Sequence, residues 1–262
     1  MTEIHHRLNQ PHNSLRSQNF GRYLFKFKWD AQNFWLKQQK LEVSDLHEQW
    51  YLNEINIYQY LKHESPELLL PFQLLDREED NNSKVISPML CLAHSNVLFD
   101  RIDFYQDITQ IKDVLIRSLN LIASLHHLNI VHADLKFDHF RMFDGRATLI
   151  DFEQSFDSRL AHKFENHGTP RYMAPELFNG ELRSFATDIY ALGIIWLEWL
   201  NQEKIQKNNY MDWAIWHCQQ QKVELKTEFT AFEAIIRGML MKRKASRLVN
   251  ICQIKQLLNE ID

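Results

Sequence analysis

Side chains suited to phosphoryl transfer stand close together in the middle of the sequence. Residues 132–139 are His-Ala-Asp-Leu-Lys-Phe-Asp-His, and Asp151 follows Asp134 by seventeen positions, within Leu-Ile-Asp-Phe-Glu. We expect the two aspartates on turns that flank a short β-hairpin. One carboxylate placed in this way can accept a hydroxyl proton, Lys136 can neutralise a phosphate, and the other carboxylate can hold a metal ion. The layout therefore favours phosphoryl transfer.

A second pair of charged residues lies upstream. Glu54 falls on the apolar stripe of a helix expected over residues 44–63, four residues after Trp50 and three before Ile57. Because the burial of an unpaired carboxylate is unfavourable, Glu54 needs a partner, and Lys37 on an expected strand is the natural candidate. The alternative is that Glu54 lies at the rim of the stripe and reaches solvent.

The elements that position these residues follow from the apolar pattern. Short aromatic runs over residues 20–40 predict two strands joined by a tight turn. The period over 44–63 predicts a helix with Leu46, Trp50, Ile57 and Leu61 on one stripe. The polar segment Asp76–Ser83 is expected to be the loop between two further strands.

After Asp107 the pattern changes to helices. A broad apolar stripe predicts a buried helix formed around Ile111, Val114, Leu115, Leu119, Ile122 and Leu125. Short strands are expected near Ile130, at 140–142 and at 148–150, with helices from there to the end. Strands first and helices later predict an α+β, bilobal fold. We expect one domain over residues 1–262, with an N-lobe at about 14–92 and a C-lobe at about 93–262.

Composition limits the class of protein. The 262 residues are 45% hydrophobic and 24% charged, which is typical of a soluble globular chain. A net charge of −4 gives no electrostatic basis for binding nucleic acid. Three scattered cysteines predict free thiols, and the first residues lack the apolar run of a secretory signal. No apolar stretch is long enough for a transmembrane segment, so a cytoplasmic protein is expected.

Two further motifs follow in a fixed order, Gly-Thr-Pro-Arg-Tyr-Met-Ala-Pro-Glu at 168–176 and Asp-Ile-Tyr-Ala-Leu-Gly at 188–193. Together with the segments around Asp134 and Asp151, they make the chain resemble the protein-kinase family over roughly residues 16–258. The resemblance implies ATP with Mg²⁺ or Mn²⁺ in the cleft between the two lobes. It also implies a protein substrate, whose identity the sequence leaves open, as it does the oligomeric state.

The same resemblance assigns roles to individual residues. Asp134 is expected to be the catalytic base, with Lys136 on the transferring phosphate. Thr169 is expected to contact both, and Asp151 to hold the metal. Lys37, paired with Glu54, is expected to bind the α- and β-phosphates. A lysine two residues after the catalytic aspartate is typical of Ser/Thr kinases. Glu176 with Arg247, and Asp188 beneath the catalytic loop, are expected to hold the fold.

Several positions depart from the family pattern near the nucleotide. Gly21 is the only glycine of the glycine-rich loop, because Arg16 and Gln18 stand where the others belong. Fewer glycines leave fewer backbone N–H groups close to the phosphates. Trp35 replaces the alanine that roofs the adenine, and an indole there can either stack on adenine or fill the pocket.

Other departures lie in the catalytic segments. His139 replaces the asparagine that binds the second metal, and imidazole suits Mn²⁺ or Zn²⁺ better than Mg²⁺. Glu153 replaces the glycine of Asp-Phe-Gly, and Ala133 replaces an arginine. These changes leave a pseudokinase, which would be a binding scaffold, as the main alternative. His139-Phe140 and Ile150–Gln154 also resemble bacterial lipopolysaccharide-core sugar kinases, but the motif at 168–176 favours a protein substrate.

Overall fold

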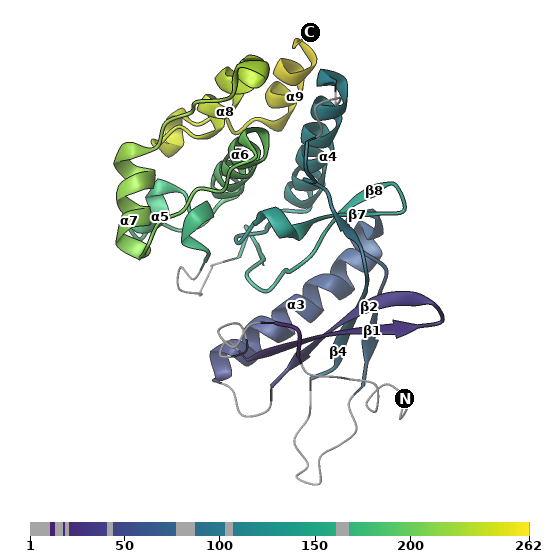
Figure 1. Cartoon of the computed structure of the whole chain (residues 1–262). Coiled ribbons are helices and arrows are strands. Elements are labelled where there is room, and N and C mark those ends of the chain that lie inside the picture. The colour runs from purple at the N-terminus through teal and green to yellow at the C-terminus, as the bar shows by residue number, and fades with distance from the viewer. Residues whose placement is uncertain are drawn as a thin grey trace. The chain divides into compact units, whose positions relative to one another are not determined.

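The fold is taken from a computed structural model, which describes residues 11–13, 18, 21–40, 44–76, 87–102, 107–160 and 168–261. The glycine-loop positions Arg16, Asn19 and Phe20, and residues 77–83 of the expected loop, lie outside these ranges. The chain separates into two compact units, Met1–Asn96 with Met142–Glu153 and Val97–Arg141 with Gln154–Asp262. Strands dominate the N-terminal part and helices the C-terminal part, so the predicted α+β class is confirmed (Figure 1).

An antiparallel sheet forms the centre of the first unit. Its strands lie in the order β1 (Arg22–Trp29), β2 (Gln32–Gln39), β4 (Met89–Ala93) and β3 (Phe72–Leu75). The turn between β1 and β2 is tight, with Asp30 and Ala31 at φ 44° and 67°. Two central residues with positive φ match the right-handed twist of a hairpin. The two strands predicted over residues 20–40 are therefore confirmed.

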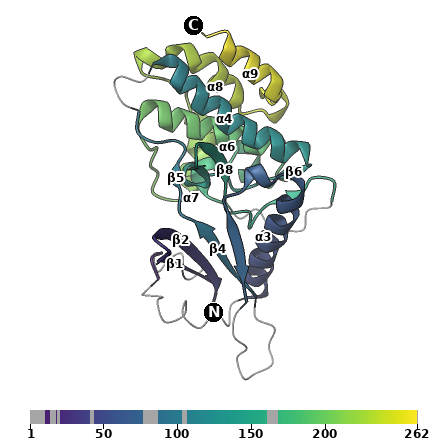
Figure 2. The ribbon, with the colours of Figure 1, turned by 90° about the vertical axis from the view of Figure 1, so that its right-hand side faces the viewer.

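Helix α3 (Asp45–Glu64) belongs to the same unit, and Figure 2 shows it beside β4. The Ser44 hydroxyl caps its N-terminus by accepting from the His47 N–H at 3.4 Å. The predicted helix is confirmed, but its buried face is slightly rotated from the predicted stripe. Ile57 is only half-buried, whereas Tyr58 is fully buried. The hydropathy pattern missed this because a tyrosine ring packs in a core despite its polar hydroxyl.

Tyr51 attaches α3 to the sheet. Its hydroxyl lies 2.9 Å from the Lys37 carbonyl oxygen on β2 and 2.8 Å from that of Pro88, and it accepts from the Leu90 N–H at 3.2 Å. The helix is thereby held to β2 and β4 at the level of Lys37, which fixes the distance between Lys37 and the next turn of α3.

The second unit is mainly helical. Its helices are α4 (Ile108–His127), α5 (Pro175–Phe178), α6 (Phe185–Asn201), α7 (Tyr210–Ile215), α8 (Glu233–Met239) and α9 (Ile251–Asn259). Every residue of α6 from Thr187 to Leu200 is buried, as expected of a helix that is apolar on all sides. The Trp196 indole N–H donates to the Ser118 hydroxyl at 3.0 Å, which ties α6 to α4. The predicted α4 stripe is buried except for Val114, which is half-buried.

Short elements connect the longer ones. The short strands are β5 (Asn96–Val97), β6 (Ile130–Val131), β7 (Phe140–Phe143), β8 (Arg146–Leu149) and β9 (Phe156–Asp157). The short 3₁₀-helices are η1 (Pro66–Leu68), η2 (Phe137–His139), η3 (Pro170–Tyr172), η5 (Thr227–Phe232) and η6 (Lys244–Ser246), and η4 (Trp216–Gln220) is a π-helix. β7 and β8 are joined by a turn at Asp144 and Gly145, both with positive φ. No helix in the described ranges has the length and apolar character needed to span a bilayer.

A buried histidine closes the core of the second unit. The His217 ring packs against Phe178 and Trp213, with ring centroids 5.5 and 5.7 Å away. Its Nε2 lies 3.0 Å from the Pro170 carbonyl oxygen and its Nδ1 2.8 Å from the Tyr190 hydroxyl. Burial lowers the pKa of His217 to about 4, so the imidazole is neutral at pH 7.

Candidate active site

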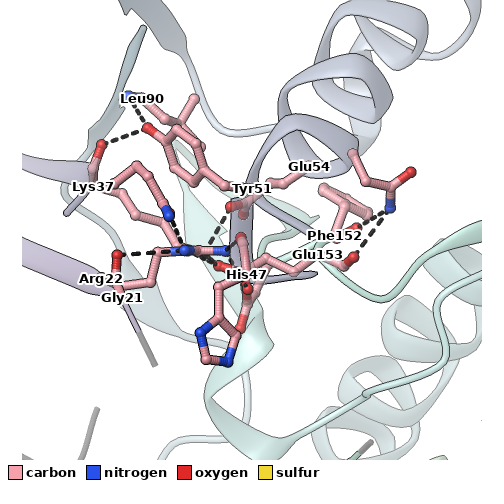
Figure 3. Close-up of polar contacts among 12 residues, drawn as sticks. Gly21, Arg22, Lys37, His47, Tyr51, Glu54, Leu90, Phe152 and Glu153 are labelled. Carbon is pink, nitrogen blue, oxygen red and sulfur yellow. Dashed lines mark hydrogen bonds and ion pairs between the residues drawn. The ribbon is translucent and has the colours of Figure 1, made fainter. Parts of the chain in front are cut away.

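Three of the predicted residues meet in the first unit. The Lys37 Nζ lies 2.7 Å from Glu54 Oε2 and 2.9 Å from Asp151 Oδ1. The Glu54 side chain is only 1% exposed, so it faces the core and does not reach solvent at the rim. The ion pair expected between Lys37 and Glu54 is thus present, and Figure 3 shows their side chains turned toward each other.

A third carboxylate joins this cluster. Glu153 Oε1 lies 2.7 Å from Lys37 Nζ, and it accepts from Arg22 Nε at 2.7 Å while its Oε2 accepts from Arg22 Nη2 at 3.1 Å. Arg22 is buried, and it also donates to the Gln39 side-chain oxygen and, at 2.8 Å, to the His47 carbonyl of α3 (Figure 3). Glu153 therefore connects the start of β1 with Lys37.

The charges in this cluster counteract the effect of burial on the pKa values of Lys37 and Glu54. Burial alone would lower the pKa of Lys37, but Asp151, Glu153 and Glu54 together raise it well above its usual value. Burial raises the pKa of Glu54, and the Lys37 charge opposes that rise. Lys37 thus stays an ammonium ion that is held by three carboxylate groups.

Helix α3 also positions the segment that carries Asp151. The Asn53 amide donates to the Glu153 carbonyl oxygen at 3.1 Å, and the Tyr58 ring packs edge-on against Phe152 with centroids 5.2 Å apart. Asp151 has φ 67°, a left-handed conformation that disfavours residues other than glycine. Contacts of α3 with the two residues that follow Asp151 therefore help to hold a strained backbone that presents its carboxylate to Lys37.

The two other residues predicted to contact the nucleotide are Gly21, which directly precedes β1, and Trp35, which lies on β2. Gly21 has φ 83°, which only glycine adopts easily, and its carbonyl accepts from the Lys40 N–H at 2.9 Å. Trp35 precedes Lys37 by two residues and so shares its face of β2. The indole lies edge-on to His12 at 5.3 Å and nearly parallel to His94 at 6.4 Å. Both roles suggested for Trp35 toward adenine stay predictions.

The predicted catalytic residues meet in the second unit. Asp134 Oδ2 lies 2.7 Å from Lys136 Nζ, and Oδ1 accepts from the Thr169 backbone N–H at 3.1 Å. Both oxygens of this carboxylate are therefore oriented by donors. His139, the predicted second metal ligand, is buried in this unit with its ring 5.6 Å from that of His132.

The residues expected to hold the fold make the contacts predicted for them. Asp188 accepts from the backbone N–H groups of His132 and Ala133 at 2.8 and 2.9 Å. Arg247 donates to both carboxylate oxygens of Glu176, at 2.7 and 2.8 Å, and both side chains are buried. These contacts fix the backbone before Asp134 and the start of α5, but they touch no reacting atom.

Sequence reasoning missed two buried arginines, Arg22 and Arg183. Arg22 bonds to Glu153, which is 131 residues away, and Arg183 donates to the Ala133 carbonyl oxygen, 50 residues away. Nothing in the residues next to either arginine indicates its partner. The replacement of glycine by Glu153 was the only available signal, because a carboxylate beside Asp151 requires a cation.

Comparisons with known proteins give the family. The sequence model of the protein kinase domain matches residues 20–260. A putative serine/threonine-protein kinase, R436, of Acanthamoeba polyphaga mimivirus is 29% identical over 220 residues, 79% of this chain and 78% of that protein. Myosin light chain kinase 3 of Rattus norvegicus is 32% identical over 55% of this chain but only 18% of its own length. The mitogen-activated protein kinase kinase kinase mom-4 of Caenorhabditis elegans is 28% identical over 58% of this chain and 28% of its own length. With a match that covers nearly all of its residues, this chain belongs to the protein kinase domain family.

Proposed function

We propose that this chain is an ATP-dependent phosphotransferase that transfers the γ-phosphate to a serine or threonine hydroxyl of a protein. The observation that carries the proposal is the orientation of the Asp134 carboxylate by Lys136 and by the Thr169 N–H. A general base must have a fixed geometry before its basicity matters. The name of one relative, the putative serine/threonine-protein kinase R436 of Acanthamoeba polyphaga mimivirus, supports the substrate class.

In this proposal Asp134 accepts the proton of the substrate hydroxyl and Lys136 neutralises charge on the transferring phosphate. Lys37 holds the α- and β-phosphates, oriented by Glu54. Carboxylate oxygens of Glu54, Asp151 and Glu153 lie within 4.8 Å of one another, and such hard donors fit Mg²⁺ or Mn²⁺. Asp151 would hold the ion, which supplies positive charge to the phosphates, and His139 stays the candidate for a second ligand.

The direct test is Asp134→Asn with labelled ATP, Mg²⁺ or Mn²⁺, and a mixture of protein substrates. We expect transfer to fall by at least about 10²-fold, since a general base contributes 10²–10⁴, while ATP still raises the melting temperature. Asp138→Asn is the matched control, because Asp138 is exposed and lies four residues away. Equal transfer by wild type and Asp134→Asn would contradict the assignment, and label on tyrosine would contradict the substrate class.

A specific observation favours the second candidate, a scaffold without catalysis. Glu153 pairs with Lys37, the residue that would bind phosphate, and also with Arg22, so Lys37 is already neutralised without a nucleotide. A thermal shift with ATP plus Mg²⁺, repeated with Mn²⁺, separates the two. A metal-dependent shift that Asp151→Ala abolishes supports the enzyme, and the lack of any shift supports the scaffold. Label in a glycolipid fraction would instead indicate the sugar-kinase alternative.

A cytoplasmic location is part of the proposal. Cys91, Cys218 and Cys252 are all free thiols. Burial raises the pKa of the Cys91 thiol to about 11, so it is unreactive at neutral pH. Three unpaired cysteines are typical of a reducing compartment, which agrees with an ATP-dependent enzyme.

A further inference from the structure

A buried arginine outside the predicted site contacts the backbone next to Asp134. Arg183 directly precedes Ser184, the residue that caps the N-terminus of α6, and it is only 5% exposed. Its Nη1 donates to the Ala133 carbonyl oxygen. Its Nη2 lies against Gly168, where a Cβ atom would be only 2.7 Å from that nitrogen. The guanidinium group thus lies between Ala133, in the loop that carries Asp134, and Gly168.

Ala133 is a residue whose backbone needs support. Its φ is 71°, in the left-handed region that a side chain disfavours. Its N–H donates to Asp188 Oδ1 at 2.9 Å, and its carbonyl accepts from Arg183. Both backbone polar groups of this strained residue are therefore bound by charged side chains, and such hydrogen bonds are stronger than neutral ones. Asp134 is the next residue, so the Ala133 turn sets the direction of its carboxylate.

The charge of Arg183 is balanced from two sides. Burial lowers the pKa of the guanidinium, and the carboxylates of Asp134 and Asp188 oppose that change. An arginine keeps its charge in proteins even so. A buried cation is an unfavourable way to fill space, because its desolvation must be offset by nearby acceptors. Here the Ala133 carbonyl accepts from the guanidinium, and two nearby carboxylates, one of them the proposed base, attract its charge.

We propose that Arg183 is a positioning residue for Asp134. By holding the Ala133 carbonyl, it maintains the left-handed turn that directs the Asp134 carboxylate toward Lys136 and the Thr169 N–H. The kinetic consequence rests on the proposed phosphotransferase function, whereas the effect on the loop does not.

Three substitutions at one position separate the charge from the hydrogen bond. Arg183→Lys keeps the charge and one donor, Arg183→Gln keeps only a donor, and Arg183→Met keeps neither. Arg117→Met, on the exposed face of α4, is the control for the loss of an arginine. The first measurement is amide hydrogen exchange of the peptide spanning residues 130–136, and the second is kcat and KM for ATP.

We expect the Ala133 amide to exchange at least about ten-fold faster in Arg183→Met than in wild type, with Arg183→Gln and then Arg183→Lys closer to wild type. In the active enzyme, kcat should fall at least ten-fold in Arg183→Met, about 1.4 kcal/mol, with KM for ATP within two-fold. A residue that only stabilised the fold would not give this split between kcat and KM, nor rescue by lysine.

Several results would overturn the inference. Unchanged exchange at 130–136 in Arg183→Met would do so, as would a lysine variant no better than the methionine variant. If Arg183→Met does not fold, Gly168→Ala tests the contact between Arg183 and Ala133 instead. The added methyl group must displace the guanidinium group, while Arg183 and its charge remain. If wild type transfers no phosphate, the proposed function fails, but the exchange data still decide whether Arg183 holds the loop.

Discussion

Replacing Glu153 by glutamine should change stability and nucleotide binding in opposite directions. The substitution keeps the size of the side chain but removes one of the three carboxylates around Lys37. In the free protein that carboxylate satisfies Arg22 and Lys37, so its loss should destabilise the fold. In the complex it would stand close to the phosphates bound by Lys37, so its loss should tighten binding.

The stability effect follows from the contacts that remain. Removing one partner of a buried ion pair typically costs about 3–5 kcal/mol. Glu153 keeps 18% of its side chain exposed, and Lys37 retains two carboxylates. Arg22 retains Gln39 and the His47 carbonyl as acceptors. We therefore expect the free energy of unfolding to fall by only about 1–3 kcal/mol.

The effect on binding follows from Coulomb's law. Glu153 lies 2.7 Å from the ammonium that would bind the phosphates, which places a phosphate charge at roughly 6–8 Å from the carboxylate. At an effective dielectric constant of about 20–40, the repulsion is about 1–3 kcal/mol per unit charge. Glu153→Gln should therefore bind ATP about 5- to 150-fold more tightly.

Urea unfolding and calorimetric titration with ATP and Mg²⁺ measure the two effects on the same samples. Glu64→Gln, an exposed glutamate at the end of α3, is the matched control and should change neither quantity. A cycle with Arg22→Gln should give a coupling energy of about 1–3 kcal/mol with Glu153→Gln. Unchanged or weaker ATP binding by Glu153→Gln would refute the claim that this carboxylate competes with phosphate.

Two other predictions concern the second unit. Arg247→Met should lower the free energy of unfolding, measured with urea, by about 3–5 kcal/mol, because it leaves the buried Glu176 carboxylate without its cation. Adding Glu176→Gln to this variant should recover part of the lost stability. His217 should make the wild type about 2 kcal/mol less stable at pH 5 than at pH 7, because the unfolded imidazole, with its usual pKa near 6.5, binds a proton that the folded one, at about 4, does not. His217→Gln should lose this part of the pH dependence in urea unfolding, whereas the exposed His63→Gln should keep it.

Sequence patterns were informative where local chemistry determines structure. The turn at Asp30 and Ala31 and the helix that begins after Ser44 depend on neighbouring residues, and both were predicted. The pairing of Glu54 with Lys37 was expected because a carboxylate in apolar surroundings needs a partner, whereas the contact of Asp134 with Thr169 was expected only from the family resemblance. A resemblance over most of the chain then specified which partners to expect.

The rest depends on contacts between residues far apart in the chain. The stripe on α3 was misplaced because Tyr58 packs against Phe72 and Phe152, which periodicity does not weigh. Arg22 and Arg183 look like ordinary surface arginines, and only the folded chain places them on Glu153 and Ala133. The replacement of the family's glycine by Glu153 was visible in the sequence, but its pairing with Arg22 was not.

Lys37 can bind a phosphate only if at least one of its three carboxylates gives way, and the structure indicates which one can. Glu54 is 1% exposed on a helix face that Tyr51 holds to the sheet, so it has no other place to go. Asp151 is held by the contacts that α3 makes with the two residues following it. Glu153 has a second cation, because Arg22 donates to both of its oxygens and would keep it neutralised after it leaves Lys37. The contact between Glu153 and Lys37 is therefore one that a nucleotide can displace, so it is compatible with the proposed phosphotransferase.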